Sequence, residues 1–143
     1  MTYFNNCILC NKNTKNIIYQ HEMYHILLVE DKYYPGYIQL VINDHIKELT
    51  DLNHAKAHEV FDVLLTLEQI IRDIFNPDKV NIAIFGNIVP HLHFHIMPRF
   101  KSDRHFPNPI WGQVTNNEYM PLQDIINKNI QLVHQIELMF QEK

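Results

Sequence analysis

Residues 91–97 have the sequence HLHFHIM, in which histidines alternate with apolar side chains. Successive side chains of a β-strand point to opposite faces, so the pattern predicts a strand with His91, His93 and His95 on one face and apolar residues on the other. The apolar face would pack on the core. A lone histidine on the opposite face would be an ordinary surface residue, but three in strict alternation indicate a chemical role.

The row of histidines is too long to hold a single metal ion. Because a strand rises about 3.3 Å per residue, the Cα atoms of His91 and His95 would lie roughly 13 Å apart. Two nitrogens bound to one zinc lie only about 3.4 Å apart. We therefore expect one end of the row to serve one purpose and the other end another.

Four further strands are predicted by short runs rich in apolar and β-branched residues, at residues 17–21, 24–30, 37–42 and 80–85. Only five residues separate the last of these from the histidine strand. Such a turn is too short for a parallel crossover, so these two strands must be antiparallel.

Two helices complete the predicted fold. Apolar residues at spacings of three and four from Asn53 to Phe75 predict a long helix with Asn53 as its N-cap, and a similar pattern between residues 122 and 140 predicts a closing helix. The irregular stretch before the closing helix has the length of a functional loop; we expect Trp111 to anchor it and Arg99, before it, to be exposed. The order of elements predicts an α+β fold, with an antiparallel sheet of about five strands, one long central helix and a C-terminal helix.

Length and composition bound the class of protein. The chain has 143 residues, enough for one compact domain and too few for two ordinary ones, so we expect a single domain over residues 1–143. No run reaches the roughly 18 apolar residues of a membrane span, and no basic leader begins the chain, so a soluble cytoplasmic protein without membrane contact is expected. The net charge of −4 argues against a nucleic-acid partner, which requires a basic face.

The alternating motif resembles the signature of the histidine triad (HIT) family of nucleotide hydrolases and transferases. The likeness extends to PGYIQLVINDHIKELTDL, which is similar to the family's strand and long helix, and to NIAIFGNIVPHLHFHIMPRF followed by HFPNPIWG. These stretches resemble a zinc-containing bacterial branch labelled diadenosine tetraphosphate hydrolase-like, and the similarity runs from Cys7 through Trp111. It implies a HIT-like fold, a nucleotide substrate such as a dinucleoside polyphosphate, and a homodimer.

The resemblance also implies roles for individual residues. His93 would attack the α-phosphorus and form a covalent nucleotidyl-histidine, and His95 would contact phosphate oxygen near the scissile bond; a neutral imidazole is a suitable nucleophile near pH 7. The family's usual Gly-Gln followed by Ser or Thr is here Gly86-Asn87-Ile88. The amide of Asn87 would still donate to phosphate, but the hydroxyl is lost. Glu30 lies near the family's position for an acid that binds ribose hydroxyls.

The cysteine pair Cys7-Ile8-Leu9-Cys10 has the spacing of a metal knuckle, which redox proteins share. A thioredoxin-type pair needs a preceding strand and a following helix, and neither is predicted here. Zinc-bearing members of the resembled family bind metal through such a pair and two histidines, which implies Cys7, Cys10, His45 and His91 as ligands. This closed set is typical of structural zinc and would leave His93 and His95 free. The alternative is two buried thiols and two unrelated histidines.

Three functions remain open from the sequence. The first is a nucleotide hydrolase or transferase that uses His93 as its nucleophile. The second is a non-catalytic nucleotide-binding or regulatory module with a structural zinc, which the changed residues Asn87 and Ile88 favour. The third, a hydrolase with a catalytic zinc at His93 and His95, lacks an evident third ligand.

Overall fold

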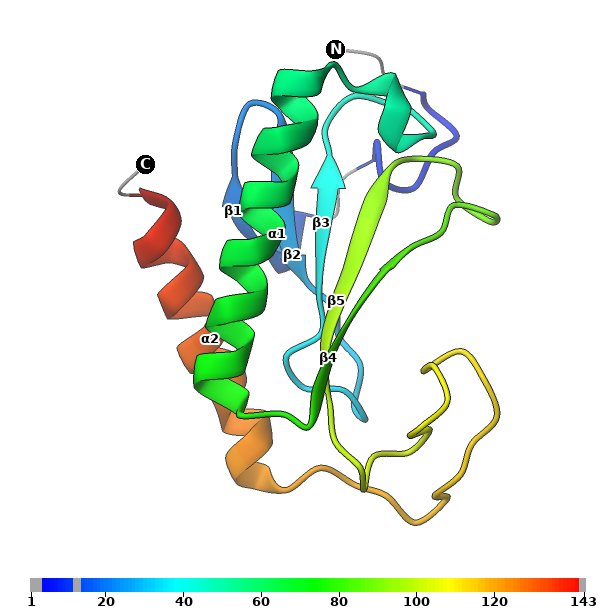
Figure 1. The fold of residues 1–143 in the computed structure, drawn as a ribbon, viewed down its shortest axis with the longest axis vertical. Coiled ribbons are helices and arrows are strands. Elements are labelled where there is room, and N and C mark those ends of the chain that lie inside the picture. Colours follow the sequence, from blue (N-terminus) through cyan, green and yellow to red (C-terminus); the bar gives the residue numbers. More distant parts are fainter. Residues whose placement is uncertain (1–3, 12–13, 142–143) are drawn as a thin grey trace.

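The computed structural model of the chain describes residues 4–11 and 14–141. Across these residues, five strands form one antiparallel sheet in the order β1-β2-β3-β5-β4 (Figure 1). Their bounds are β1 Ile17–Gln20, β2 Tyr24–Leu28, β3 Ile38–Ile42, β4 Lys79–Ile84 and β5 His93–Arg99. The α+β prediction and the antiparallel pairing of β4 with β5 are confirmed.

The histidine strand β5 lies inside the sheet, between β3 and β4. His93 is paired with Val41 and His95 with Gln39 of β3, and all seven residues of β5 are buried. The apolar side chains Phe94 and Ile96 belong to the main core, as the alternation predicts. The remaining histidines, His93 and His95, therefore stand on the other face of a firmly held strand.

The strand begins later than the alternation predicts. His91 was expected within it, but β5 begins at His93, and His91 lies in the bend before it. The cause is non-local. The carbonyl of Leu92 accepts a hydrogen bond from the amide of Ile42, the last residue of β3, but the amide of Leu92 donates to the carbonyl of Ile46. This second bond ties the backbone to the segment that follows β3, so the regular pairing ends there.

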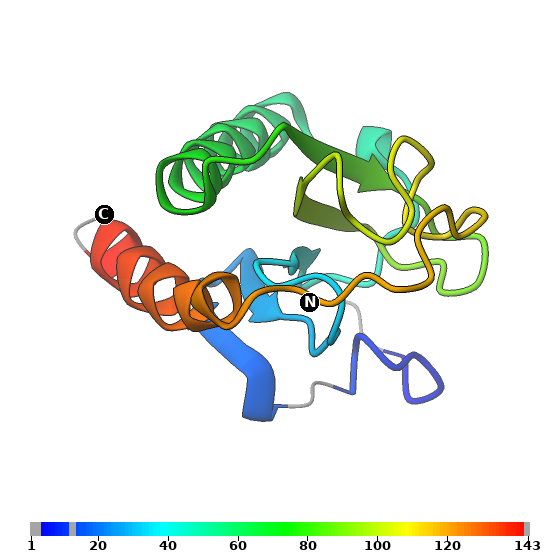
Figure 2. The ribbon, with the colours of Figure 1, turned by 90° about the horizontal axis from the view of Figure 1, so that it is seen from below.

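Both predicted helices are present. Helix α1 covers His54–Phe75, and the side chain of its N-cap Asn53 accepts a hydrogen bond from the Lys56 amide, which satisfies a free donor of the first turn. Helix α2 covers Gln123–Gln141. The two helices lie side by side in both views (Figures 1 and 2), and their buried residues join those of the sheet in one core.

Two short 3-10 turns, η1 Thr14–Asn16 and η2 Leu49–Asp51, precede β1 and α1. The described segments contain two long helices, α1 and α2, and neither is apolar enough to cross a membrane.

The loop between β5 and α2 is fastened at its start by a buried ion pair. Arg99 was expected to be exposed, but only 2% of it is accessible. Its guanidinium bonds Asp103 at 2.7 and 3.1 Å, and it also donates to Asn81 and to the carbonyl of Asn108. Burial raises the pKa of Asp103, but the hydrogen bonds and charge of Arg99, together with hydrogen bonds from the backbone amides of His105 and Phe106, outweigh this and leave that pKa below its ordinary value. The pair fixes the course of the loop that carries Trp111.

Candidate functional site

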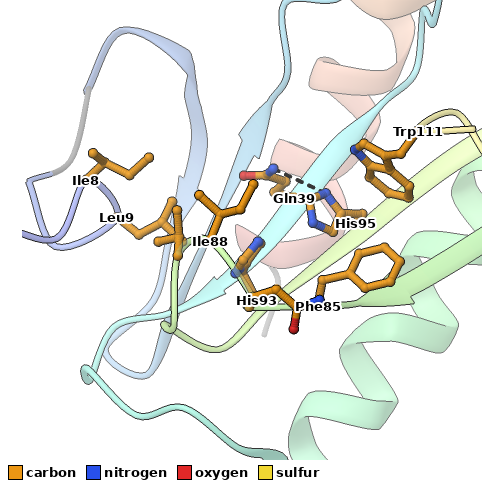
Figure 3. Close-up of a pocket in the computed structure, with 11 residues that line it drawn as sticks. Ile8, Leu9, Gln39, Phe85, Ile88, His93, His95 and Trp111 are labelled. Atoms are coloured by element: carbon orange, nitrogen blue, oxygen red, sulfur yellow. Dashed lines mark hydrogen bonds between the residues drawn. The ribbon is translucent and has the colours of Figure 1, made fainter.

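A cavity of about 500 Å³ opens on the face of the sheet that carries His93 and His95. Figure 3 shows side chains from separate segments of the chain around it, with His93 and His95 supplied by β5. The N-terminal segment supplies Ile8 and Leu9, β3 supplies Gln39, the turn between β4 and β5 supplies residues 85–89, and the loop after β5 supplies Trp111. No Lys or Arg is among these lining residues, so binding there depends on apolar contact and on neutral donors.

His93 has a defined protonation pattern. Its Nδ1 lies 2.5 Å from the carbonyl oxygen of His91. A carbonyl only accepts, so Nδ1 must carry the proton and donate it. In a neutral imidazole this leaves the lone pair on Nε2, the nitrogen that a nucleophile needs.

His95 stands next to His93 on the same face, with ring centroids 4.8 Å apart. Its Nδ1 lies 2.6 Å from the hydroxyl of Tyr37 and 3.3 Å from Nε2 of Gln39, the contact dashed in Figure 3. Burial, with a smaller effect from His93, lowers the pKa of His95 to about 4. His95 is therefore neutral at physiological pH.

Two aromatic rings form the wall beyond His95. The ring of Trp111 is 4.9 Å from that of His95 and 5.0 Å from that of Phe85, both in edge-on arrangements. Trp111 was expected to anchor its loop, but half of its surface is exposed and it lines the cavity. The ion pair of Arg99 with Asp103 fastens the loop instead.

Of the two predicted substrate-binding residues, Asn87 lies at the cavity and Glu30 does not. Asn87 lines the cavity, in a turn that begins at Gly86 with a φ of 132°, a conformation that favours glycine. Ile88, where the resembled family has a hydroxyl, is 94% exposed at the cavity mouth. Glu30 is exposed just after β2 and is not among the lining residues, so its contact with ribose stays a prediction.

Sequence reasoning missed Tyr37, Gln39 and Phe85. The first two had a signal, because a glutamine within the otherwise apolar run IQLVI of β3 marks a polar face. In a period-two strand Tyr37, Gln39 and Val41 share one face. Phe85 carried no signal, since an aromatic residue at a strand end is usually part of a core.

The four predicted metal ligands meet in one cluster. The ligand atoms of Cys7, Cys10, His45 and His91 all lie within 4.8 Å of one another. Sulfur-to-nitrogen distances are 3.5 Å from Cys7 to His91, 3.4 Å from Cys10 to His45 and 3.6 Å from Cys10 to His91. A tetrahedral zinc with Zn–S near 2.3 Å and Zn–N near 2.0 Å has S···N edges of about 3.5 Å. The cluster could hold a metal ion.

The orientation of His91 supports the same conclusion. Its Nε2 lies 2.5 Å from the carbonyl oxygen of Ile42 and therefore donates a proton there. The lone pair is left on Nδ1, which faces the two sulfurs. A backbone carbonyl that orients a ligating imidazole in this way is a common feature of metal sites.

The chain belongs to the histidine triad family, because the sequence model described as the HIT domain matches residues 11–102, more than half of its length. A bis(5'-nucleosyl)-tetraphosphatase (asymmetrical) of Schizosaccharomyces pombe is 28% identical over 89 residues, which are 59% of this chain and 49% of that protein. The chain thus spans about half the length of this relative.

Solved structures share the fold over nearly the whole chain. A histidine triad protein from Bradyrhizobium japonicum has a TM-score of 0.74 at 24% identity, over 94% of this chain and 98% of the other. A zinc-bound histidine triad family protein from Mycobacterium smegmatis has a TM-score of 0.63 at 18% identity, over 96% and 98%. At these identities the likeness establishes the fold.

Proposed function

We propose that this protein cleaves at the α-phosphate of dinucleoside polyphosphates or related nucleotide conjugates, through a covalent nucleotidyl intermediate on His93. One observation carries the proposal: the carbonyl of His91 holds the proton of His93 on Nδ1, which leaves Nε2 as a nucleophile beside the cavity. The tetraphosphatase relative supports the substrate class.

The reaction would proceed in two displacements. Nε2 of His93 forms a bond to the α-phosphorus while the bond from phosphorus to the leaving-group oxygen breaks. His95, 4.8 Å away between ring centroids, stabilises the charge that develops on that oxygen. Water then attacks phosphorus, the phosphorus–nitrogen bond breaks, the proton of the water is lost to solvent and a nucleoside monophosphate leaves.

The cavity walls suit the rest of a nucleotide. Phe85, Trp111 and the apolar residues Ile8, Leu9 and Ile88 offer surfaces for a nucleobase, since every base has a face that stacks on aromatic side chains. The amide of Asn87, which lines the cavity, would donate to a phosphate oxygen. Because the described lining residues include no Lys or Arg, neutral donors such as the two histidines and this amide would contact the phosphates.

We further propose that the cysteine–histidine cluster holds a structural zinc. The donor set and the S···N distances fit that ion. Bound there, zinc would tie the N-terminal segment to the sheet. It would not take part in the displacements. A catalytic zinc at His93 and His95 is not part of the proposal, because these two histidines have no third ligand group among the residues that the structure describes.

A homodimer is also part of the proposal. Strand β4 is at the edge of the sheet, and its Ile82 and Ile84 are 40% and 43% exposed. Phe61 and Leu65 of α1 are exposed as well. An edge strand with uncovered apolar side chains is a surface that proteins normally protect, and a second copy would do so.

The test is a screen of adenylated and guanylated compounds, with turnover and binding measured on the same samples. Cleavage that leaves a nucleoside monophosphate, together with a nucleotidyl group on the peptide that contains His93, is the expected result. Binding of nucleotide without turnover of any compound would instead select the non-catalytic module. Purified His134→Ala serves as the control, because His134 is exposed on α2 and outside both sites.

A further inference from the structure

We propose that Tyr37, assisted by Gln39, is a positioning residue that holds His95 with its proton on Nε2, so that His95 presents an N–H donor to the leaving group. The proposal rests on the proposed function for the identity of that group. The tautomer itself is a property of the protein without substrate.

The contacts of His95 fix which nitrogen accepts. Gln39 approaches Nδ1 with its amide nitrogen, which only donates. The hydroxyl of Tyr37 is closer, at 2.6 Å, and reaches the same nitrogen. With two donors directed at it, Nδ1 must accept, so the proton of the neutral imidazole stays on Nε2.

The neighbours of His93 and His95 therefore hold these two histidines of β5 in opposite tautomers. His93 gives its Nδ1 proton to a carbonyl and offers a lone pair from Nε2. His95 receives a proton contact at Nδ1 and offers a proton from Nε2. The nucleophile needs a lone pair to attack phosphorus, and the departing oxygen needs a hydrogen-bond donor. The tautomer of His93 provides the lone pair, and the tautomer of His95 provides the donor.

Tyr37 is held well enough to fulfil this role. It is 5% exposed and packs with Tyr34 and Met97 in a separate small core beneath the loop. Its backbone amide bonds Tyr34, and its carbonyl accepts from Val29, so both ends of the residue are tied. The hydroxyl can move little from its position against His95.

Tyr37 is not in a position to act as the acid of the reaction, because it does not line the cavity and its hydroxyl bonds Nδ1 of His95. Burial raises the pKa of Tyr37 above its ordinary value of 10, which makes it a weaker acid than free tyrosine. A tyrosine that does not ionise remains a hydrogen-bond donor throughout turnover. Its effect on the chemistry must therefore pass through His95.

The test combines a spectroscopic and a kinetic measurement on Tyr37→Phe and on the double variant Tyr37→Phe/Gln39→Leu. Nitrogen-15 NMR of histidine-labelled protein without substrate reports the tautomer. We expect His95 to carry its proton on Nε2 in the natural protein, and Nδ1-protonated histidine to gain population in the double variant. Tyr34→Phe is the matched control: it removes a hydroxyl from the same small core, one that bonds Asp103 and His105 instead, and should leave the His95 signals unchanged.

The kinetic arm separates positioning from general damage. Turnover should fall roughly 10-fold in Tyr37→Phe and roughly 100-fold in the double variant, with KM nearly constant, since one donor to a developing charge is worth about 10²–10³ in rate. The loss should shrink for a nucleoside p-nitrophenyl phosphate, whose leaving group needs little help. An Nδ1-protonated His95 in the natural protein, or losses that do not depend on the leaving group, would overturn the proposal.

These outcomes differ from a failure of the proposed function. If His93→Ala remained active, the covalent mechanism would be wrong, but the NMR measurement would still decide the tautomer of His95. Thermal unfolding of Tyr37→Phe and Tyr34→Phe, measured together, shows whether each variant is folded at the assay temperature.

Discussion

Nδ1 of His93 donates a hydrogen bond to the carbonyl oxygen of His91, and this contact joins the two sites of the molecule. The imidazole of His91 faces the cysteines of the metal cluster, while its carbonyl sets the tautomer of the proposed nucleophile. Replacing the side chain of His91 would remove a proposed metal ligand but leave the carbonyl in place. The two sites should therefore respond differently to substitution.

Substitutions in the cavity should lower turnover to different extents, in a fixed order. His93→Ala should lower turnover by several orders of magnitude, because it removes the group that divides the reaction into two steps. His95→Ala should cost on the order of 10²–10³, and Asn87→Ala should be mildest, because each removes one donor. Steady-state kinetics on purified variants gives the ranking. More than about a tenth of normal turnover in His93→Ala, with unchanged products, would contradict the covalent mechanism, since even general acid–base help alone is worth roughly 10²–10⁴.

Metal content and stability should fall together when the cluster is broken. We expect about one zinc per chain in gently purified protein, and Cys10→Ser should lower both the zinc content and the unfolding temperature, because metal binding contributes to folding. Elemental analysis and calorimetry measure the two. His134→Ala should keep its zinc. Well under half an equivalent in the natural protein would count against the site.

His95 should make the protein less stable in mild acid. Its pKa is lowered to about 4 in the folded state, so between pH 6.5 and 4 the unfolded chain binds the proton and the folded one does not. The free energy of unfolding should therefore fall by about 2 kcal/mol from pH 7 to pH 5 through this residue.

The acid effect is isolated by comparison with His95→Gln, because the metal cluster also loses ions in acid. Urea unfolding of both proteins at pH 7 and pH 5 provides the measurement. The decrease in the free energy of unfolding from pH 7 to pH 5 should be smaller in the variant by about 2 kcal/mol. An equal decrease in both proteins would show that His95 contributes nothing to it.

Trp111 provides a direct optical probe of the cavity. It is the only tryptophan of the chain, so its fluorescence reports this wall alone. Adenosine monophosphate should change that fluorescence, whereas ribose 5-phosphate, which lacks a base to stack, should change it little. Trp111→Ala should weaken nucleotide binding by about 1–3 kcal/mol, measured by calorimetry. Unaltered affinity in the variant would place the base elsewhere.

The edge of the sheet should mediate dimerisation. Light scattering at micromolar concentration should give twice the mass of one chain. Ile82→Lys puts a charge on β4, where charged residues protect sheet edges, and should shift the protein toward the monomer. A monomeric natural protein would remove this part of the proposal.

Local patterns predicted the fold well where the deciding contacts are local. The alternation of β5 gave its core face, and the spacing of three and four gave α1 with its cap at Asn53. The predicted first residue of β5 was wrong because the backbone amide of Leu92 bonds the distant Ile46, outside β3, and the strand ends at that point. No period in the sequence reports such bonds.

The candidate site was predictable to a smaller extent. The family resemblance implied the proposed metal ligands and the two cavity histidines. The exposure of Arg99 was predicted wrongly because its partners Asn81, Asp103 and Asn108 come together only in the folded chain. Tyr37 was missed for a similar reason. Its proposed role depends on its contact with His95, which the pairing of the following strand β3 with β5 brings about.

Ile8 and Leu9, which lie between the two cysteines of the proposed zinc site, are also part of the cavity wall. Removal of the zinc by a chelator would leave His93 and His95 in place, because the sheet holds them, but Ile8 and Leu9 would no longer be fixed against the cavity. In an ordinary assay the stripped protein would resemble an enzyme deprived of a catalytic metal, although no ligand of that metal touches the reacting atoms. The diagnosis would turn on whether saturating substrate restores the rate, because a missing wall weakens binding whereas a missing Lewis acid slows the reaction at any concentration.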